Sequence, residues 1–156
     1  MKRRQFLILA TLAACKTSSS SDDPAASRAS VPWTPDRLVT SADLAKELAG
    51  PQAQRPRVVH VGPERLFKNA HVPGAIHAGE AGDAEGLEAF ARWLAPVPRD
   101  VDLVVYCGCC PYKNCPNIRP AYSKAVATGF THVRVLDLPT TLKADWTEHG
   151  LPTESG

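Results

Sequence analysis

Residues 102–136 read DLVVYCGCCPYKNCPNIRPAYSKAVATGFTHVRVL, and this stretch decides the fold. Residues 102–106 form an almost wholly apolar run, which is typical of a strand buried on both faces. Residues 120–128 predict a helix that ends at Gly129, and residues 132–136 predict a second strand. A strand, a helix and another strand in succession predict a right-handed crossover within a parallel sheet.

The rest of the chain continues this alternation of strand-like and helix-like segments. Further strands are predicted at residues 57–61 and 75–77, and further helices at 42–49, 63–68 and 83–95. The first helix has Ser41 as its expected cap and Gly50 as its stop. The sequence therefore predicts one α/β domain with a central, mostly parallel sheet and helices on both faces. Ligands of such sheets bind beyond the carboxyl ends of the strands, which points to the loop after Tyr106.

Length and charge limit the classes of function. The chain has 156 residues, of which 44% are hydrophobic, so it allows one globular domain with its own core. Its formal charge of +2 comes from 18 basic and 16 acidic residues, and removal of Lys2, Arg3 and Arg4 with an expected leader leaves 15 minus 16, or −1. Nucleic acid is not an expected partner, because binding to it needs clustered basic residues.

The first fifteen residues are typical of an export signal. Basic residues 2–4 precede a short apolar stretch at residues 6–14. Residues 12–15 (LAAC) resemble the bacterial lipobox, in which the cysteine is acylated and becomes the mature N-terminus. An ordinary secretory signal with an incidental cysteine is the alternative. Residues 3–7 (RRQFL) also resemble a twin-arginine signal, so both the general secretory route and the twin-arginine route fit the sequence.

A polar segment separates this signal from the predicted domain. Residues 16–35 are rich in Ser, Pro and Asp and poor in apolar residues, so we expect a flexible tether. We therefore expect a signal peptide over residues 1–14, a lipidated Cys15 with its tether over 15–37, and the domain over 38–156. The protein would then be a membrane lipoprotein of the cell envelope that faces the periplasm or the exterior.

Four cysteines lie close together in the loop after the central strand. They are Cys107, Cys109, Cys110 and Cys115. Structural disulfides usually join distant parts of a chain, so crowding within one loop favours chemistry instead. The loop leads into a helix N-terminus, where unpaired N–H groups and the helix dipole stabilise a thiolate. Lys113 and Arg119 add positive charge nearby.

Over about residues 38–152, the sequence resembles the rhodanese family of sulfurtransferases. The matching pieces are residues 58–63 (VVHVGP), 70–76 (AHVPGAI), 104–107 (VVYC), 119–121 (RPA) with the following helix, and Trp146 with 150–152 (GLP). Their order and spacing follow the family pattern. The resemblance implies a single rhodanese-like domain that moves sulfane sulfur through a cysteine persulfide. It also implies a small-molecule donor such as thiosulfate, a thiol acceptor and no cofactor.

The resemblance implies a nucleophile in the cysteine loop. Alignment from the strand makes it Cys107, whereas alignment backwards from Arg119 brings Cys115 closest to the family spacing. We prefer Cys107 because the end of a strand is more rigidly placed than the middle of a loop. Gly108, Lys113 and Arg119 are expected to bind the anionic donor.

The chain departs from the family pattern in two respects. The family usually has Asp and Arg where this chain has His60 and Gly62, and the loop between Cys107 and Arg119 is longer than usual. Phosphatases of the same fold need a cysteine and an arginine six positions apart. No loop cysteine here has an arginine at that spacing, so a phosphatase is disfavoured. His60 is expected to be a core histidine, and His71 is expected to brace the turn that follows it.

Other functions use the same loop and stay open on sequence alone. Cys107 and Cys110, followed by Pro111, have the C-x-x-C spacing of thiol-disulfide oxidoreductases. A binding module is a second alternative, in which copper or zinc would be held by Cys107, Cys109, Cys110 and Cys115. The third alternative is a pair of disulfides that only rigidifies the loop.

Overall fold

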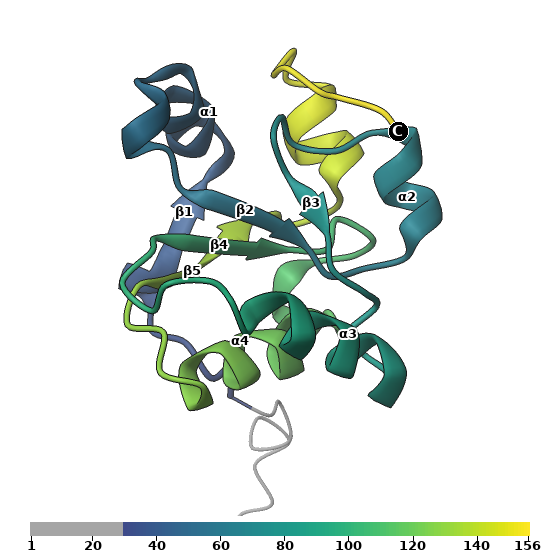
Figure 1. Cartoon of the computed structure of the whole chain (residues 1–156). Coiled ribbons are helices and arrows are strands. Elements are labelled where there is room, and N and C mark those ends of the chain that lie inside the picture. The colour runs from purple at the N-terminus through teal and green to yellow at the C-terminus, as the bar shows by residue number, and fades with distance from the viewer. Residues whose placement is uncertain (1–29) are drawn as a thin grey trace, which may run out of the picture.

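The computed structural model describes residues 30–156, and strands and helices alternate along them (Figure 1). The strands are β1 (Leu38–Thr40), β2 (Arg57–His60), β3 (Ile76–His77), β4 (Leu103–Tyr106) and β5 (Val133–Asp137). The helices are α1 (Ser41–Ala49), α2 (Glu64–Asn69), α3 (Ala84–Leu94) and α4 (Ile118–Ala127). Short helical turns are η1 (Pro35–Arg37), η2 (Gln52–Gln54), η3 (Tyr112–Asn114) and the π-helical η4 (Lys143–Thr147). The predicted signal peptide and Cys15 lie outside the described residues.

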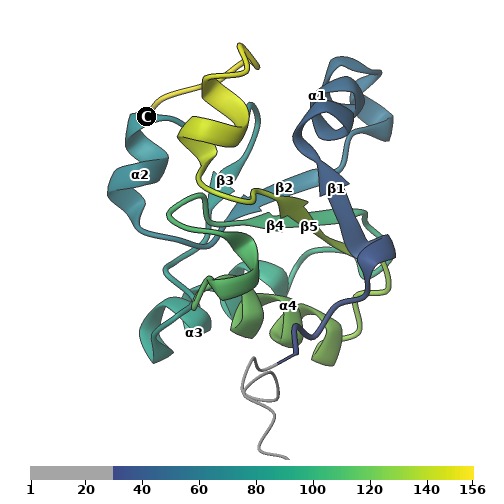
Figure 2. The ribbon, with the colours of Figure 1, turned by 180° about the vertical axis from the view of Figure 1, so that it is seen from behind.

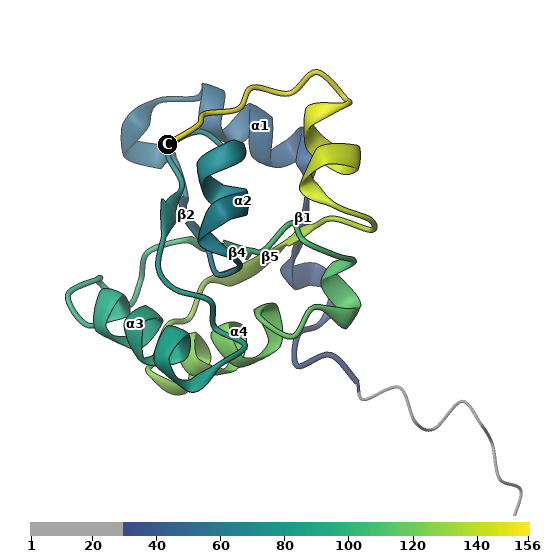
Figure 3. The same ribbon diagram turned by 90° about the vertical axis from the view of Figure 1, so that its right-hand side faces the viewer.

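The five strands form one parallel sheet in the order β1-β5-β4-β2-β3. Strand β4 is central, and its Val105 is in register with Val59 of β2 and Val135 of β5. Helices α3 and α4 cover one face, whereas α1, α2 and η4 cover the other (Figures 1 and 3). The predicted single α/β domain with helices on both faces is therefore confirmed.

The sheet separates two apolar layers. On the side of α3 and α4, helix residues such as Phe90 and Ala125 pack with Val105. On the other side, Leu44 and Trp146 pack against alternate strand residues. Fully burying a side chain of the size of Leu or Phe contributes about 1.5–3 kcal/mol. Every residue of β4 is buried between these layers, so the end of this strand is a rigid support for the loop that follows.

The structure corrects the predicted start of α1 and confirms the predicted end of α4. The cap of α1 is Thr40 and not Ser41, because the Thr40 side chain accepts a hydrogen bond from the Asp43 backbone N–H at 3.1 Å. Ser41 is instead the first helical residue. Gly129 follows the end of α4 with φ of +95°, a conformation that favours glycine, so the predicted stop there is confirmed.

The packed part of the chain begins before residue 38, the predicted start of the domain. Strand β1 pairs with β5 at the edge of the sheet (Figure 2), although no strand was predicted there. Trp33, within the predicted tether, is only 6% exposed and lies with its ring 6.2 Å from that of Tyr112 and 5.4 Å from that of Tyr122. Within residues 30–156, no helix is both long enough and apolar enough to cross a bilayer.

Candidate active site

The cysteine loop begins where β4 ends and is fixed to the segment after β5. Gly108 has φ of +77°, and a Cβ atom there would lie 2.7 Å from Cβ of Leu142, so only glycine fits. The Gly108 carbonyl accepts a hydrogen bond from the Leu142 N–H at 3.1 Å. The Tyr112 N–H donates to the Leu138 carbonyl at 3.1 Å. These contacts hold both arms of the loop in place.

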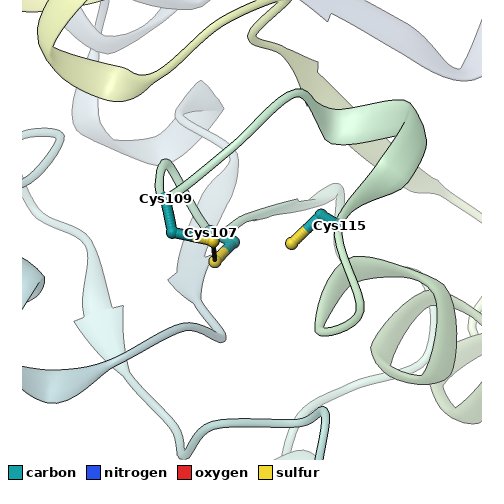
Figure 4. A group of neighbouring side chains, drawn as sticks. All are labelled: Cys107, Cys109 and Cys115. Carbon is teal, nitrogen blue, oxygen red and sulfur yellow. Dashed lines mark hydrogen bonds between the residues drawn. The ribbon is translucent and has the colours of Figure 1, made fainter.

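The loop brings its sulfur atoms together (Figure 4). The Sγ atoms of Cys107, Cys109 and Cys115 all lie within 4.8 Å of one another. Cys109 Sγ is 3.1 Å from the sulfur of Cys107 and also 3.1 Å from that of Cys110. All four residues are free thiols in this structure. The predicted cluster is thus a true spatial cluster, with Cys109 as the common neighbour of the predicted Cys107 and Cys110 redox pair.

A buried amide holds Cys107 in position. Asn117 is 3% exposed, and its Nδ2 donates to Cys107 Sγ at 3.4 Å. Its Oδ1 accepts a hydrogen bond from the Gly82 N–H at 2.7 Å. The amide therefore links the segment before α3 to the sulfur atom. Sequence reasoning did not single out Asn117, because its partner Gly82 is distant in sequence and no local pattern marks the contact.

Cys107 and Cys115 form an unequal pair of thiols. A hydrogen bond between Cys107 and Cys115 is the main reason why the pKa of Cys107 is raised, and burial raises it further. The same hydrogen bond lowers the pKa of Cys115 to about 6, and N–H groups of Asn117 and Ile118 at the start of α4 add to this effect. Of the two, Cys115 therefore loses its proton more readily than Cys107.

A cleft of about 560 Å³ opens onto the first two cysteines of the loop. Cys107, Gly108 and Cys109 line it, whereas Cys115 does not. Its walls come from α2 and η4, which contribute the exposed cations Arg65 and Lys143. Lys143 also pairs with Glu148 at 3.7 Å, and across residues 30–156 no carboxylate pairs with Arg65. The cleft thus offers positive charge near buried sulfur, which suits a small anionic ligand.

Comparison with known proteins identifies the family. The model of the rhodanese-like domain matches residues 40–138. The chain belongs to the rhodanese-like domain family. This rhodanese-like domain is similar to the BH2092 protein from Bacillus halodurans, with a TM-score of 0.58, 20% identity and 76% of each chain covered. It is also similar to the Alr3790 protein from Anabaena sp., with a TM-score of 0.55, 20% identity, and 76% of this chain and 82% of that chain covered. No curated protein matches the chain.

Two predicted anion-binding residues of this rhodanese-like domain lie elsewhere than expected. The Arg119 guanidinium donates to the Lys113 carbonyl at 2.7 Å and to the Ser30 carbonyl at 3.4 Å. The Lys113 ammonium lies 5.6 Å from the centre of the Tyr112 ring. Neither cation is among the residues that line the cleft, although Gly108 is. In the cleft the positive charges belong to Arg65 and Lys143, which the sequence did not mark.

His60 and Gly62, the two residues that replace the usual Asp and Arg of the rhodanese-like family, both lie against Cys107. A Cβ atom on Gly62 would lie 2.3 Å from Cys107 Sγ, so the missing side chain makes room for the sulfur. His60 Nε2 donates to the Cys107 carbonyl at 2.7 Å, and since a carbonyl only accepts, Nε2 carries the proton. Burial lowers the pKa of His60 to about 4, and its buried Nδ1 has no hydrogen-bond partner within residues 30–156. His60 is thus a neutral core histidine that fixes the backbone of Cys107.

His71 braces the turn beside the cleft, as predicted. Its Nδ1 donates to the Phe67 carbonyl at 2.8 Å, and the Phe67 ring stacks on it. Its backbone forms an isolated antiparallel bridge with Glu154. The Glu154 carboxylate accepts a hydrogen bond from the Gly74 N–H at 2.9 Å. These contacts fix the end of α2, which carries Arg65.

Proposed function

We propose that this rhodanese-like domain is a sulfurtransferase in which Cys107 carries sulfane sulfur as a persulfide. One observation carries the proposal most directly: buried Cys107 lines a cleft with cationic walls and hydrogen-bonds with Cys115, whose pKa is lowered. Membership of the family supports sulfurtransferase chemistry in general. The choice of Cys107 rests on its access to the cleft, which Cys115 lacks.

In the first step, the Cys107 sulfur attacks the outer sulfur of a donor such as thiosulfate. A Cys107–sulfur bond forms, the sulfur–sulfur bond of thiosulfate breaks, and its electron pair leaves on sulfite. The proton of the Cys107 thiol passes to Cys115, which acts as the general base. Asn117 Nδ2 steadies the attacking sulfur, and Arg65 and Lys143 attract the anionic donor.

In the second step, a thiol acceptor removes the sulfur. The acceptor thiolate attacks the outer persulfide sulfur, and Cys107 leaves with the electron pair of the broken bond. The Cys107 thiolate then recovers its proton from Cys115. The domain thus returns to its starting state in a two-step exchange with ping-pong kinetics.

A burst experiment tests this assignment on the purified full-length chain. The reduced chain is mixed with thiosulfate, and the sulfite released in the first turnover is measured. Cys107→Ser should abolish the burst, whereas Cys109→Ser should keep most of it, and Lys68→Gln, at an exposed site that does not line the cleft, serves as the control. Cys115→Ser should slow the burst near neutral pH and recover it in alkali. Loss of the burst at every pH in Cys115→Ser alone, with Cys107→Ser active, would identify Cys115 as the nucleophile instead.

A second candidate function is the binding of a soft metal such as copper or zinc. One observation favours it, because three cysteine sulfurs lie within 4.8 Å of one another and thiolates bind these ions well. Metal analysis combined with thiol counting, on protein purified from its native compartment, separates the two functions. Stoichiometric metal with blocked thiols would replace the sulfurtransferase with a metal-binding module.

We also propose that the chain is held at a membrane through an acylated Cys15, outside the cytoplasm. The lipobox-like residues 12–15 after a basic and then an apolar segment support this location. Cys15→Ser should move the protein from the membrane fraction to the soluble fraction. A Cys15→Ser variant that stays with the membrane would contradict the anchor.

A further inference from the structure

We propose that this domain also reduces the sulfur it accepts to hydrosulfide, with Cys115 as an internal resolving cysteine. The inference rests on the proposed persulfide at Cys107 and adds a second fate for it. Its basis is that Cys115 lies beside Cys107 but, unlike Cys107 and Cys109, does not line the cleft.

The three sulfurs differ in where they lie relative to the cleft. Cys107 and Cys109 both line it, whereas Cys115 is fully buried and does not. In Figure 4 the three sulfurs form a triangle, and the sulfur of Cys115 faces the other two. An outer sulfur delivered through the cleft therefore lies in the space that Cys109 also lines, whereas Cys115 contacts Cys107 from outside the cleft.

This order matters because displacement at sulfur is in line. A thiol that breaks a sulfur–sulfur bond must approach opposite to the sulfur that leaves. The leaving sulfur of a Cys107 persulfide occupies the cleft, so the line of approach comes from Cys115. Cys109, although only 3.1 Å from Cys107, lines the cleft itself and so shares that space with the leaving sulfur. Burial of Cys115 also keeps it from outside thiols and reserves it for its neighbour.

The step balances without any additional oxidant. A bond forms between the sulfurs of Cys115 and Cys107, while the bond from Cys107 to the outer sulfur breaks. The electron pair of that bond leaves with the outer sulfur, and the Cys115 thiol proton joins it, so the product is hydrosulfide. The persulfide sulfur is reduced, and the two cysteines are oxidised to a disulfide. A dithiol reductant that enters through the cleft and attacks Cys107 then restores both thiols and takes the disulfide itself.

A single-turnover experiment on the reduced full-length chain tests the inference. The chain, freed of reductant and kept without oxygen, receives thiosulfate or, separately, an organic persulfide. With thiosulfate, the wild type should release sulfite and hydrosulfide in equal amounts, lose two thiols and give a linked peptide that contains Cys107 and Cys115. Cys115→Ser, assayed in alkali, should release sulfite, form almost no hydrosulfide and retain sulfur that cyanide removes. Lys68→Gln, at an exposed site on α2 that does not line the cleft, is the control and should behave as the wild type.

The possible failures are distinct. Sulfite without hydrosulfide from the wild type would overturn the inference and leave the sulfurtransferase intact. A peptide that links Cys107 to Cys109, or hydrosulfide that persists in Cys115→Ser and is lost in Cys109→Ser, would assign the resolving role to Cys109 and overturn it as well. The peptide assay on the wild type needs no variant to fold. No sulfur transfer from either donor would overturn both proposals together.

Discussion

Gly62 and Cys107 lie so close that a Cβ atom on residue 62 would be 2.3 Å from the Cys107 sulfur. No side chain can share that space with Sγ. The arginine that the family usually has at this position would therefore not fit beside the sulfur of Cys107 as it lies here. Gly62 has no side chain with which to bind a donor, and the positive charge near the sulfur comes from α2 and η4 instead.

Gly62→Ala is expected to displace the sulfur and impair catalysis without unfolding the protein. A misplacement of about 1 Å at a reacting atom can cost roughly 10²-fold in rate. The measurement is the sulfite burst, with circular dichroism to verify folding. Gly50→Ala, in which the new Cβ meets only backbone oxygens of α1, is the matched control and should keep its burst. A normal sulfite burst in Gly62→Ala would show that Sγ of Cys107 can react from another position.

Two substitutions of Asn117 should separate stability from catalysis. Asn117→Ala removes the acceptor for the Gly82 N–H, and an unpaired buried donor costs about 1–3 kcal/mol. Asn117→Asp keeps that acceptor but replaces the Nδ2 donor with a negative charge beside Cys107. We expect the alanine variant to lower the free energy of unfolding and the aspartate variant mainly to slow the burst. Equal rates in wild type and Asn117→Asp would contradict a positioning role.

The rate of sulfur uptake should follow the ionisation of Cys115. Because its pKa is lowered to about 6, Cys115 is a thiolate above that pH and can take the Cys107 proton. Below about pH 6 the thiol form cannot, so kcat/KM should rise with pH through this value and then level off. In Cys115→Ser the rise should move into the alkaline range. If kcat/KM of Cys115→Ser rises over the same pH range as in the wild type, Cys115 is not the base.

Arg65 should contribute to donor binding through its charge. It lines the cleft, so Arg65→Gln should raise KM for thiosulfate about fivefold, as expected for a loss of about 1 kcal/mol of attraction, with little change in kcat. Lys68→Gln is the matched control, because Lys68 lies on the same helix but pairs with Glu64 at 2.9 Å and does not line the cleft. Added salt should shrink the difference between wild type and Arg65→Gln. Equal KM values at low salt would exclude Arg65 from donor binding.

Buried His60 should make the fold less stable in mild acid. Burial lowers its folded pKa to about 4 from 6.5, so as pH falls between these values the unfolded chain takes up a proton that the folded chain refuses. The free energy of unfolding should therefore fall by roughly 3 kcal/mol over this interval through His60 alone. His60→Gln can keep a donor for the Cys107 carbonyl and should reduce this fall, whereas His132→Gln, at an exposed site, should not. Urea unfolding at pH 7 and near pH 4.5 measures the effect.

The fold was largely predictable because its central strands are buried on both faces. The apolar runs predicted at 57–61, 102–106 and 132–136 match β2, β4 and β5 to within one residue at each end. Strand β1 was missed because three residues carry no periodicity, and they become a strand only by pairing with distant β5. The cap of α1 was placed one residue late because Thr40 and Ser41 are both good capping residues.

Only those parts of the site whose residues are neighbours in the sequence could be predicted. The cysteines cluster in space because they cluster in one loop. Gly62, Arg65 and Asn117 act on Cys107 or on its cleft through contacts made by folding, and no spacing rule reveals such contacts. Arg119 was expected near the sulfur because it is close in sequence, but the loop curves so that its guanidinium also reaches the backbone of Lys113.

The packing of Trp33 on the cysteine loop gives the protein an optical reporter of its own chemistry. Among the tryptophans, Trp33 is the one whose ring neighbours Tyr112, which lies within the loop between Cys110 and Cys115. A disulfide or a bound sulfur that shifts this loop changes the surroundings of the indole. We therefore expect the intrinsic fluorescence of the chain to change with the state of its cysteines, so that their reaction can be followed in real time without an attached dye.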